Sequence, residues 1–71
     1  MIIKIRVKKN CPKTYLEKIT KDRFIVYLSR DVVETAVDEA IIKLVSREFV
    51  TPPHKIRLET VDPVNKTIEI F

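Results

Sequence analysis

Only one stretch of this 71-residue chain has the apolar spacing of a helix, and it lies between segments whose apolar and polar residues alternate. Alternation with a period of two is typical of a strand with one buried face, whereas apolar residues at i, i+3, i+4 and i+7 favour a helix. A sheet with one apolar face needs a second layer to cover it. The sequence therefore predicts one α+β domain, residues 1–71, with two layers: a small sheet of about four strands and one main helix on one face.

Four segments carry the strand pattern, two before the helix and two after it (β-β-α-β-β): residues 2–8, 23–29, 54–61 and 66–71. A fifth segment, 14–19, is ambiguous and reads as a short strand that leads into a turn at 20–22. The segment 23–29 is apolar on both sides because of Ile25 and Tyr27, which indicates a central position or a covered second face. The inward residues of the four segments are expected to be Ile3, Ile5, Val7, Phe24, Val26, Leu28, Ile56, Leu58, Ile68 and Ile70.

The helical pattern begins near residue 33 and ends before the prolines at 52 and 53, since a residue that precedes proline avoids the α region. Asp31 and Glu34 are spaced as in a capping box, which predicts Asp31 as the N-cap. Acidic residues come first and basic residues later, an order that complements the helix dipole. The expected inward residues are Val33, Val37, Ala40, Ile41, Leu44 and Val45.

The chain contains no glycine, which excludes the loops that cradle phosphates through close approach of the backbone. Turns with positive φ are expected at Asn or Asp instead, and the candidates are Asn10, Asp22, Asp62 and Asn65. The single cysteine cannot form an internal disulfide, whereas small domains in oxidising compartments are usually cross-linked, so we expect a cytoplasmic protein. No apolar run approaches the roughly 18–20 residues of a membrane span.

Candidates for catalysis are few. Cys11 could act as a nucleophile only beside a base or a positive field, and nothing in the sequence places the one histidine, His54, near it. A small buried apolar role is favoured for Cys11. One His and one Cys do not make a zinc site, and the acidic residues at 31–39 are better explained by the helix start than by paired acid–base catalysis. We therefore expect no enzyme activity, no metal and no cofactor.

Basic residues gather at the start of the chain. Residues 1–23 hold eight basic against two acidic residues, a net +6, while the remainder holds six against eight, a net −2. Such asymmetry hints at an anionic partner, although charges on an open sheet face often serve only solvation. The candidate binding residues are Lys4, Arg6, Lys8, Tyr27, Arg57 and Lys66.

Two hypotheses follow from this pattern. The favoured one is an interaction or accessory module that meets a protein partner through an apolar set, Ile25, Tyr27 and Phe71. The alternative is RNA binding, because Lys and Arg contact phosphates and aromatic rings stack on bases. The paired aromatics and glycines of an RNA-recognition motif are missing.

The order and spacing of these segments resemble the YggU family of small α+β proteins. The family's first strand and loop are similar to RVKKNCPK, its second long strand to DRFIVYLS, and its helix, proline-containing exit and next strand to DEAIIKLVSREFVTPPHKIRLE. The chain departs from the family at the helix start, where residues 35–38 replace a Gly-Lys-Ala-Asn run. It also departs between the last strands, where VDPVNK keeps only Lys66 of a Gly-x-x-Ser-Arg-x-Lys pattern. The resemblance implies a fold and no reaction.

Overall fold

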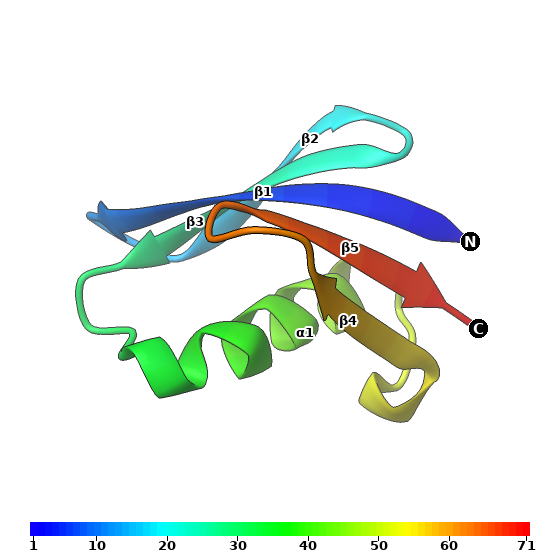
Figure 1. Cartoon of the computed structure of the whole chain (residues 1–71). Helices are drawn as coiled ribbons and strands as arrows, with labels where there is room; N and C mark the ends of the chain where they lie inside the picture. The colour runs from blue at the N-terminus through cyan, green and yellow to red at the C-terminus, as the bar shows by residue number, and fades with distance from the viewer.

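The protein is described here by a computed structural model that covers all 71 residues (Figure 1). The predicted α+β class is confirmed, but the sheet has five strands rather than about four, because the ambiguous segment after Pro12 forms a strand of its own. Short 3-10 turns, η1 (Glu34–Ala36) and η2 (Pro53–Lys55), flank the helix. The main elements are β1 (Ile2–Cys11), β2 (Tyr15–Thr20), β3 (Arg23–Ser29), α1 (Val37–Glu48), β4 (Ile56–Thr60) and β5 (Asn65–Ile70).

The strand order across the sheet is β2-β3-β1-β5-β4, so β1, the longest strand, occupies the centre. β2 follows β1 in the chain but lies on the far side of β3, and β3 therefore pairs with β1 in parallel. The other pairs, β2 with β3, β1 with β5, and β4 with β5, are antiparallel. β3 thus has a partner on each edge, as its two apolar sides predicted.

The helix covers one face of this sheet and leaves the other face uncovered (Figure 1). Every inward residue expected from the strands is buried or packed against the core, and Phe24 also meets the Phe49 ring edge-on at 5.5 Å between centroids. The core contains eleven buried apolar residues: Ile3, Ile5, Val7, Phe24, Val26, Leu28, Val37, Ile41, Val45, Ile56 and Ile68.

The start of the helix differs from the prediction. α1 begins at Val37, and Val33 lies before it in extended backbone with 61% of its surface exposed. Asp31 is not the N-cap, because the capping position belongs to Ala36, which offers no side-chain hydrogen bond. The 3-10 turn η1 separates Asp31 from α1, so the first fully buried residue of this segment is Val37, while Val32 packs partly buried against the core. The predicted partner of Asp31, Glu34, instead pairs with Lys9 at 2.7 Å.

Positive φ occurs at two residues, Asn10 (58°) and Val50 (49°). Asn10 was predicted; it lies where the pairing of β1 with β3 shifts between Lys8 and Cys11, so β1 continues past residue 8. Val50 follows the C-cap of α1, a position that glycine usually fills. The other candidates, at 22, 62 and 65, keep ordinary backbone angles. A chain without glycine therefore closes its helix with a strained valine.

Candidate functional site

The uncovered face of the sheet collects the side chains that alternate with the core residues, and we call it the open face. Strand register brings these side chains into rows that cross the sheet. Its residues are Ile2, Lys4, Arg6, Lys8, Tyr15, Glu17, Ile19, Arg23, Ile25, Tyr27, Arg57, Glu59, Asn65, Thr67 and Glu69.

Four exposed basic residues form what we call the basic cluster at the middle of the open face. Lys4, Arg6 and Lys8 occupy successive outward positions of β1, about 6.7 Å apart for an extended strand. Arg23 joins them from β3, where it is the register partner of Lys4. The ion pairs of the protein use other cations, namely Lys9, Lys43, Arg57 and Lys66. The basic cluster is therefore a positive surface without an internal counter-ion in contact.

Two tyrosines stack at one end of this cluster. The rings of Tyr15 and Tyr27 lie 4.3 Å apart between centroids and 12° from parallel. Lys8 lies over the Tyr27 ring at 5.7 Å and Lys13 over the Tyr15 ring at 5.6 Å. Each ring thus has a neighbouring ring and a lysine close to it, and the pair is not a vacant stacking platform.

The Tyr27 hydroxyl donates a hydrogen bond to Oε1 of Glu17 at 2.5 Å. This bond, with smaller contributions from desolvation and from the negative charge of Glu17, raises the pKa of Tyr27 to about 12. The hydrogen bond holds the Glu17 carboxylate on Tyr27, and Glu17 is in no ion pair with a cation of the basic cluster.

A hollow of about 550 Å³ lies beside the basic cluster. Three cations of the cluster, Lys4, Arg6 and Arg23, contribute to its lining. Its apolar lining includes Ile19 and Ile25, and its polar lining includes groups of the β4–β5 turn and of β5. The hollow thus combines positive charge with apolar surface in one place.

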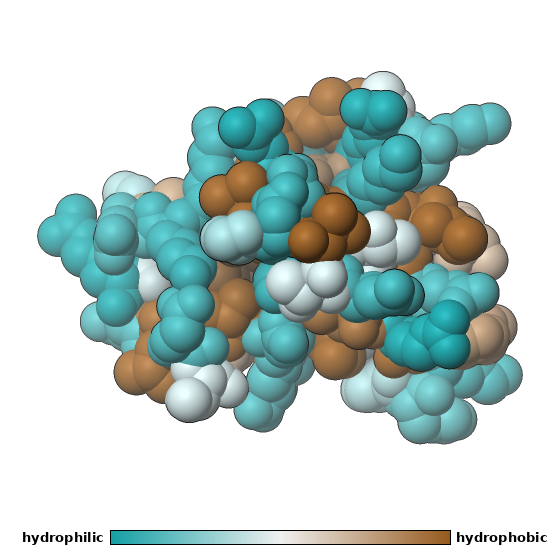
Figure 2. All heavy atoms as spheres, viewed as in Figure 1, coloured by the Kyte–Doolittle hydropathy of each residue, from teal (hydrophilic) through white to brown (hydrophobic).

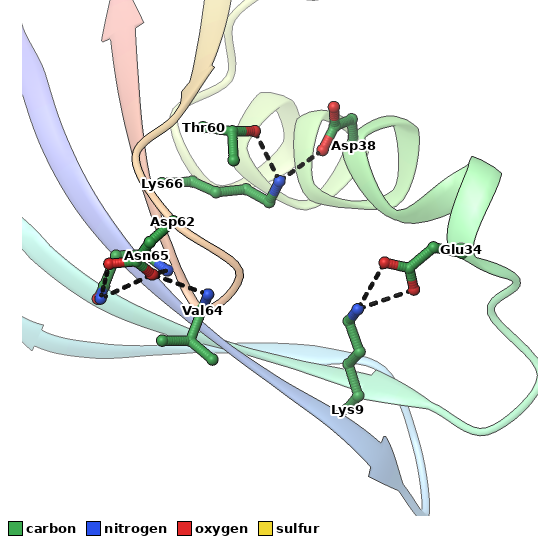
Figure 3. Close-up of polar contacts among 8 residues, drawn as sticks. All are labelled: Lys9, Glu34, Asp38, Thr60, Asp62, Val64, Asn65 and Lys66. Carbon is green, nitrogen blue, oxygen red and sulfur yellow. Dashed lines mark hydrogen bonds and ion pairs between the residues drawn. The ribbon is translucent and has the colours of Figure 1, made fainter.

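The β4–β5 turn places one carboxylate at this hollow. Oδ1 of Asp62 accepts the backbone N–H groups of Val64 at 2.9 Å and Asn65 at 2.8 Å (Figure 3). The side-chain amide of Asn65 also donates to this carboxylate, and these bonds lower the pKa of Asp62; the charge of Arg6 lowers it slightly further. Asp62 is therefore an anion committed to its own turn.

The structure brings together Lys4, Arg6, Lys8 and Tyr27 of the predicted binding residues, and it sets two apart. Arg57 shares the open face but lies on the edge strand β4, where its guanidinium is 2.7 Å from Glu69 and packs on the Phe71 ring. Its charge is already matched.

Lys66 lies on the opposite, helix-covered side of the sheet, with only 9% of its surface exposed. Its ammonium group is 2.9 Å from Thr60 Oγ1 and 3.0 Å from Asp38 Oδ1, so it joins β5 to α1 (Figure 3). The alternation in the sequence predicts this inward position, because Lys66 is separated by two and four residues from the inward Ile68 and Ile70 and so lies on the same face of the strand. The same argument applied to β3 would have added Arg23, which shares the parity of Ile25 and Tyr27.

A second hollow, of about 580 Å³, lies between the start of α1 and the β4–β5 turn. Its lining is mostly polar, and its cations already have partners: Lys9 pairs with Glu34, and Lys66 with Asp38 (Figure 3). This hollow is therefore less suited than the open face to an anionic ligand.

Cys11 and His54 do not meet. Cys11 ends β1 half-buried, with its thiol 3.6 Å from the carbonyl oxygens of Lys8 and Lys9. His54 is exposed in η2, two residues before Ile56, which begins β4 and pairs with Ile70 at the end of β5. No three His, Cys, Asp or Glu side chains are grouped so that they could hold a metal ion. None of the helices has the length and apolar character to cross a bilayer.

The open face can therefore bind an anionic group through unpaired cations and an apolar group through the isoleucines of its hollow. The resemblance to the YggU family stays a prediction. A scan against protein-family models and a search of curated proteins find no match for this chain.

Proposed function

We propose that the protein is a non-catalytic binding module whose open face holds nucleic acid by its phosphates. The observation that carries the proposal is the basic cluster, four exposed cations on an uncovered sheet face, none of them in an ion pair. Cations that already hold a carboxylate must break that contact before they bind a phosphate. Unpaired Lys and Arg instead exchange loosely held counter-ions for phosphate, which drives nucleic-acid binding.

The distribution of acidic groups supports a path for the bound strand along β1. Glu17 lies at the β2 edge, and Glu59 and Glu69 lie on the β4–β5 side of the open face. The exposed cations of the open face that have no ion-pair partner and stand in adjacent register positions therefore lie on β1 and β3. A polyanion is drawn to this central band because its cations hold no carboxylate of the protein.

A protein partner bound through Ile25, Tyr27 and Phe71 receives less support from the geometry. Tyr27 is level with Lys8 and Phe71 lies beyond the level of Ile2, so they are about 20 Å or more apart along the strands. Ile25 and Tyr27 are also half-buried among charged neighbours. On the side of the molecule that Figure 2 shows, hydrophobic groups are scattered among polar ones and form no continuous patch.

The test is fluorescence anisotropy with a labelled polypyrimidine RNA, titrated from low to moderate salt. Four phosphate contacts predict a log–log salt slope of about −3, from roughly −0.7 per contact on a single strand. Substitution of Lys4, Arg6 and Lys8 by Ser leaves Arg23 alone and should reduce the slope to about −0.7. The melting temperature should hardly change, because exposed charges contribute little to folding.

The matched control removes the same charge elsewhere, by substitution of Lys43, Arg47 and Lys55 with Ser. These residues are exposed on α1 and in η2. The control should retain the wild-type slope. Absence of binding at low salt, or an equal loss of slope in the control, would contradict the proposed function.

A further inference from the structure

We infer that the hollow beside the basic cluster accepts one base of a single strand, with the adjoining phosphate on Lys4 and Arg23. This inference rests on the proposed function and specifies its substrate class: unpaired, base-bearing nucleic acid rather than a duplex. It follows from the juxtaposition of apolar side chains and unpaired cations in a single hollow of about 550 Å³.

Contact with a phosphate group alone would not stabilise the apolar side chains of the hollow. Ile19 on β2, 52% exposed, and the half-buried Ile25 on β3 line it beside Arg23. The free energy falls when a flat, weakly polar surface such as a nucleobase covers exposed isoleucine surface and removes it from water. A duplex keeps its bases stacked inside and presents phosphates and sugars to a flat sheet. Only a single strand can place a base against these side chains.

The polar part of the hollow sets the orientation of the strand. Asp62 carries a negative charge on the β4–β5 side, and Lys4 and Arg23 carry positive charge on the β1–β3 side. Phosphate is repelled from the first and drawn to the second. The side-chain amide N–H of Asn65 is already held by Asp62, so its carbonyl oxygen remains an acceptor for a base N–H. The base thus points toward β5, and its phosphate lies over β1 and β3.

The tyrosines do not compete for this role. Tyr15 and Tyr27 stack on each other, and lysines lie over both rings, so a base would have to displace a cation to reach them. Lys8 instead contacts a neighbouring phosphate. Its separation from Arg6, about 6.7 Å along the strand, is comparable to the spacing of successive phosphates in an extended single strand.

The experiment compares three fluorescent probes of equal length at low salt: oligouridine, an abasic strand with the same phosphates, and a duplex. The wild-type protein should bind oligouridine about tenfold more tightly than the abasic strand. It should bind the duplex more weakly than oligouridine as well, even though the duplex has the greater charge density.

The test variant is Ile19→Ser, and the matched control is Ile2→Ser, because Ile2 is 58% exposed on the same face but lies outside the hollow. Ile19→Ser should weaken oligouridine binding about fivefold and leave both its salt slope and the affinity of the abasic strand unchanged. Ile2→Ser should change neither affinity. Both substitutions are at exposed positions, and a thermal melt verifies that each variant is folded.

The outcomes separate the two proposals. The protein could bind oligouridine and the abasic strand with equal affinity and lose both affinities when the basic cluster is removed. This result would overturn the base site and leave the proposal of phosphate binding intact. Equal or tighter binding of the duplex, or no effect of Ile19→Ser, would overturn the base site too. If no probe binds at low salt while a polyglutamate peptide does, the open face serves an acidic protein and both proposals fail.

Discussion

At the scale of single residues, Val50 holds a backbone conformation that a β-branched side chain rarely adopts. Its φ of 49° lies in the left-handed region, and its side chain is 90% exposed, so packing gives little in return for the strain. The conformation is kept because it closes α1: the Thr51 N–H donates to the Ser46 carbonyl oxygen at 3.0 Å. This is the hydrogen bond of a helix C-terminus that usually contains glycine.

We expect Val50→Gly to stabilise the protein by about 0.5–1 kcal/mol. The left-handed conformation costs a residue with a Cβ about 1–2 kcal/mol, and part of that gain is lost to the greater freedom of glycine in the unfolded chain. The denaturant midpoint measures the difference. The control is Val33→Gly, at an exposed valine with ordinary extended angles, which should lower the midpoint. If both variants lowered it equally, Val50 would not be strained.

At the scale of elements, Lys66 is the polar contact that ties β5 to α1. Its side chain is 10% exposed, and its ammonium group has two partners, Thr60 beside it and Asp38 on the helix. A buried cation that loses its anion retains the cost of its own desolvation. Loss of Asp38 would leave the Lys66 ammonium group buried without an anion, and this cost is larger than the net attraction between the two charges.

We expect Asp38→Asn to destabilise the protein by about 1–2 kcal/mol, the range for a buried charged group that loses a partner. Lys66→Met removes the charge and keeps the length of the side chain, so it should be nearly neutral. The double variant should then be more stable than Asp38→Asn alone. Chemical denaturation of the three variants measures this cycle.

Asp31→Asn is the control for that cycle, because Asp31 is an exposed carboxylate that neither caps α1 nor pairs with a cation. It should leave stability unchanged. A loss as large as that of Asp38→Asn would show that negative charge near the helix start matters in general, and not the specific contact with Lys66.

The sequence predicts the core residues correctly in strands that have one buried face and one exposed face. The alternation in β1 and β3 identified Ile3, Ile5, Phe24 and Val26 as core residues, because a strand in the middle of a two-layer sheet has one covered face. β2 was ambiguous because it is an edge strand and only Leu16 of its six residues is partly buried. The helix start was misplaced because Asp31 and Glu34 fit a capping pattern that the 3-10 turn interrupts.

At the scale of the whole molecule, the basic cluster is a product of the strand order. Arg23 stands beside Lys4 because β3 inserts in parallel next to β1. Had β2 paired with β1 in a simple hairpin, its Glu17 would have lain among the cations instead of at the far edge. The sequence alone could predict the row of Lys4, Arg6 and Lys8 from its period. It could not predict the fourth cation or the hollow, since both depend on pairing between distant segments.

The central claim is that nucleic acid binds at the open face over β1 and β3, and the most direct measurement is NMR mapping with ¹⁵N-labelled protein and unlabelled oligouridine. The amides of Lys4–Lys8 and of Arg23–Tyr27 should shift as the RNA is added at low salt, and those of α1, on the covered side, should not. Shifts confined to α1 or to the β4 edge, or no shifts at all, would contradict the account.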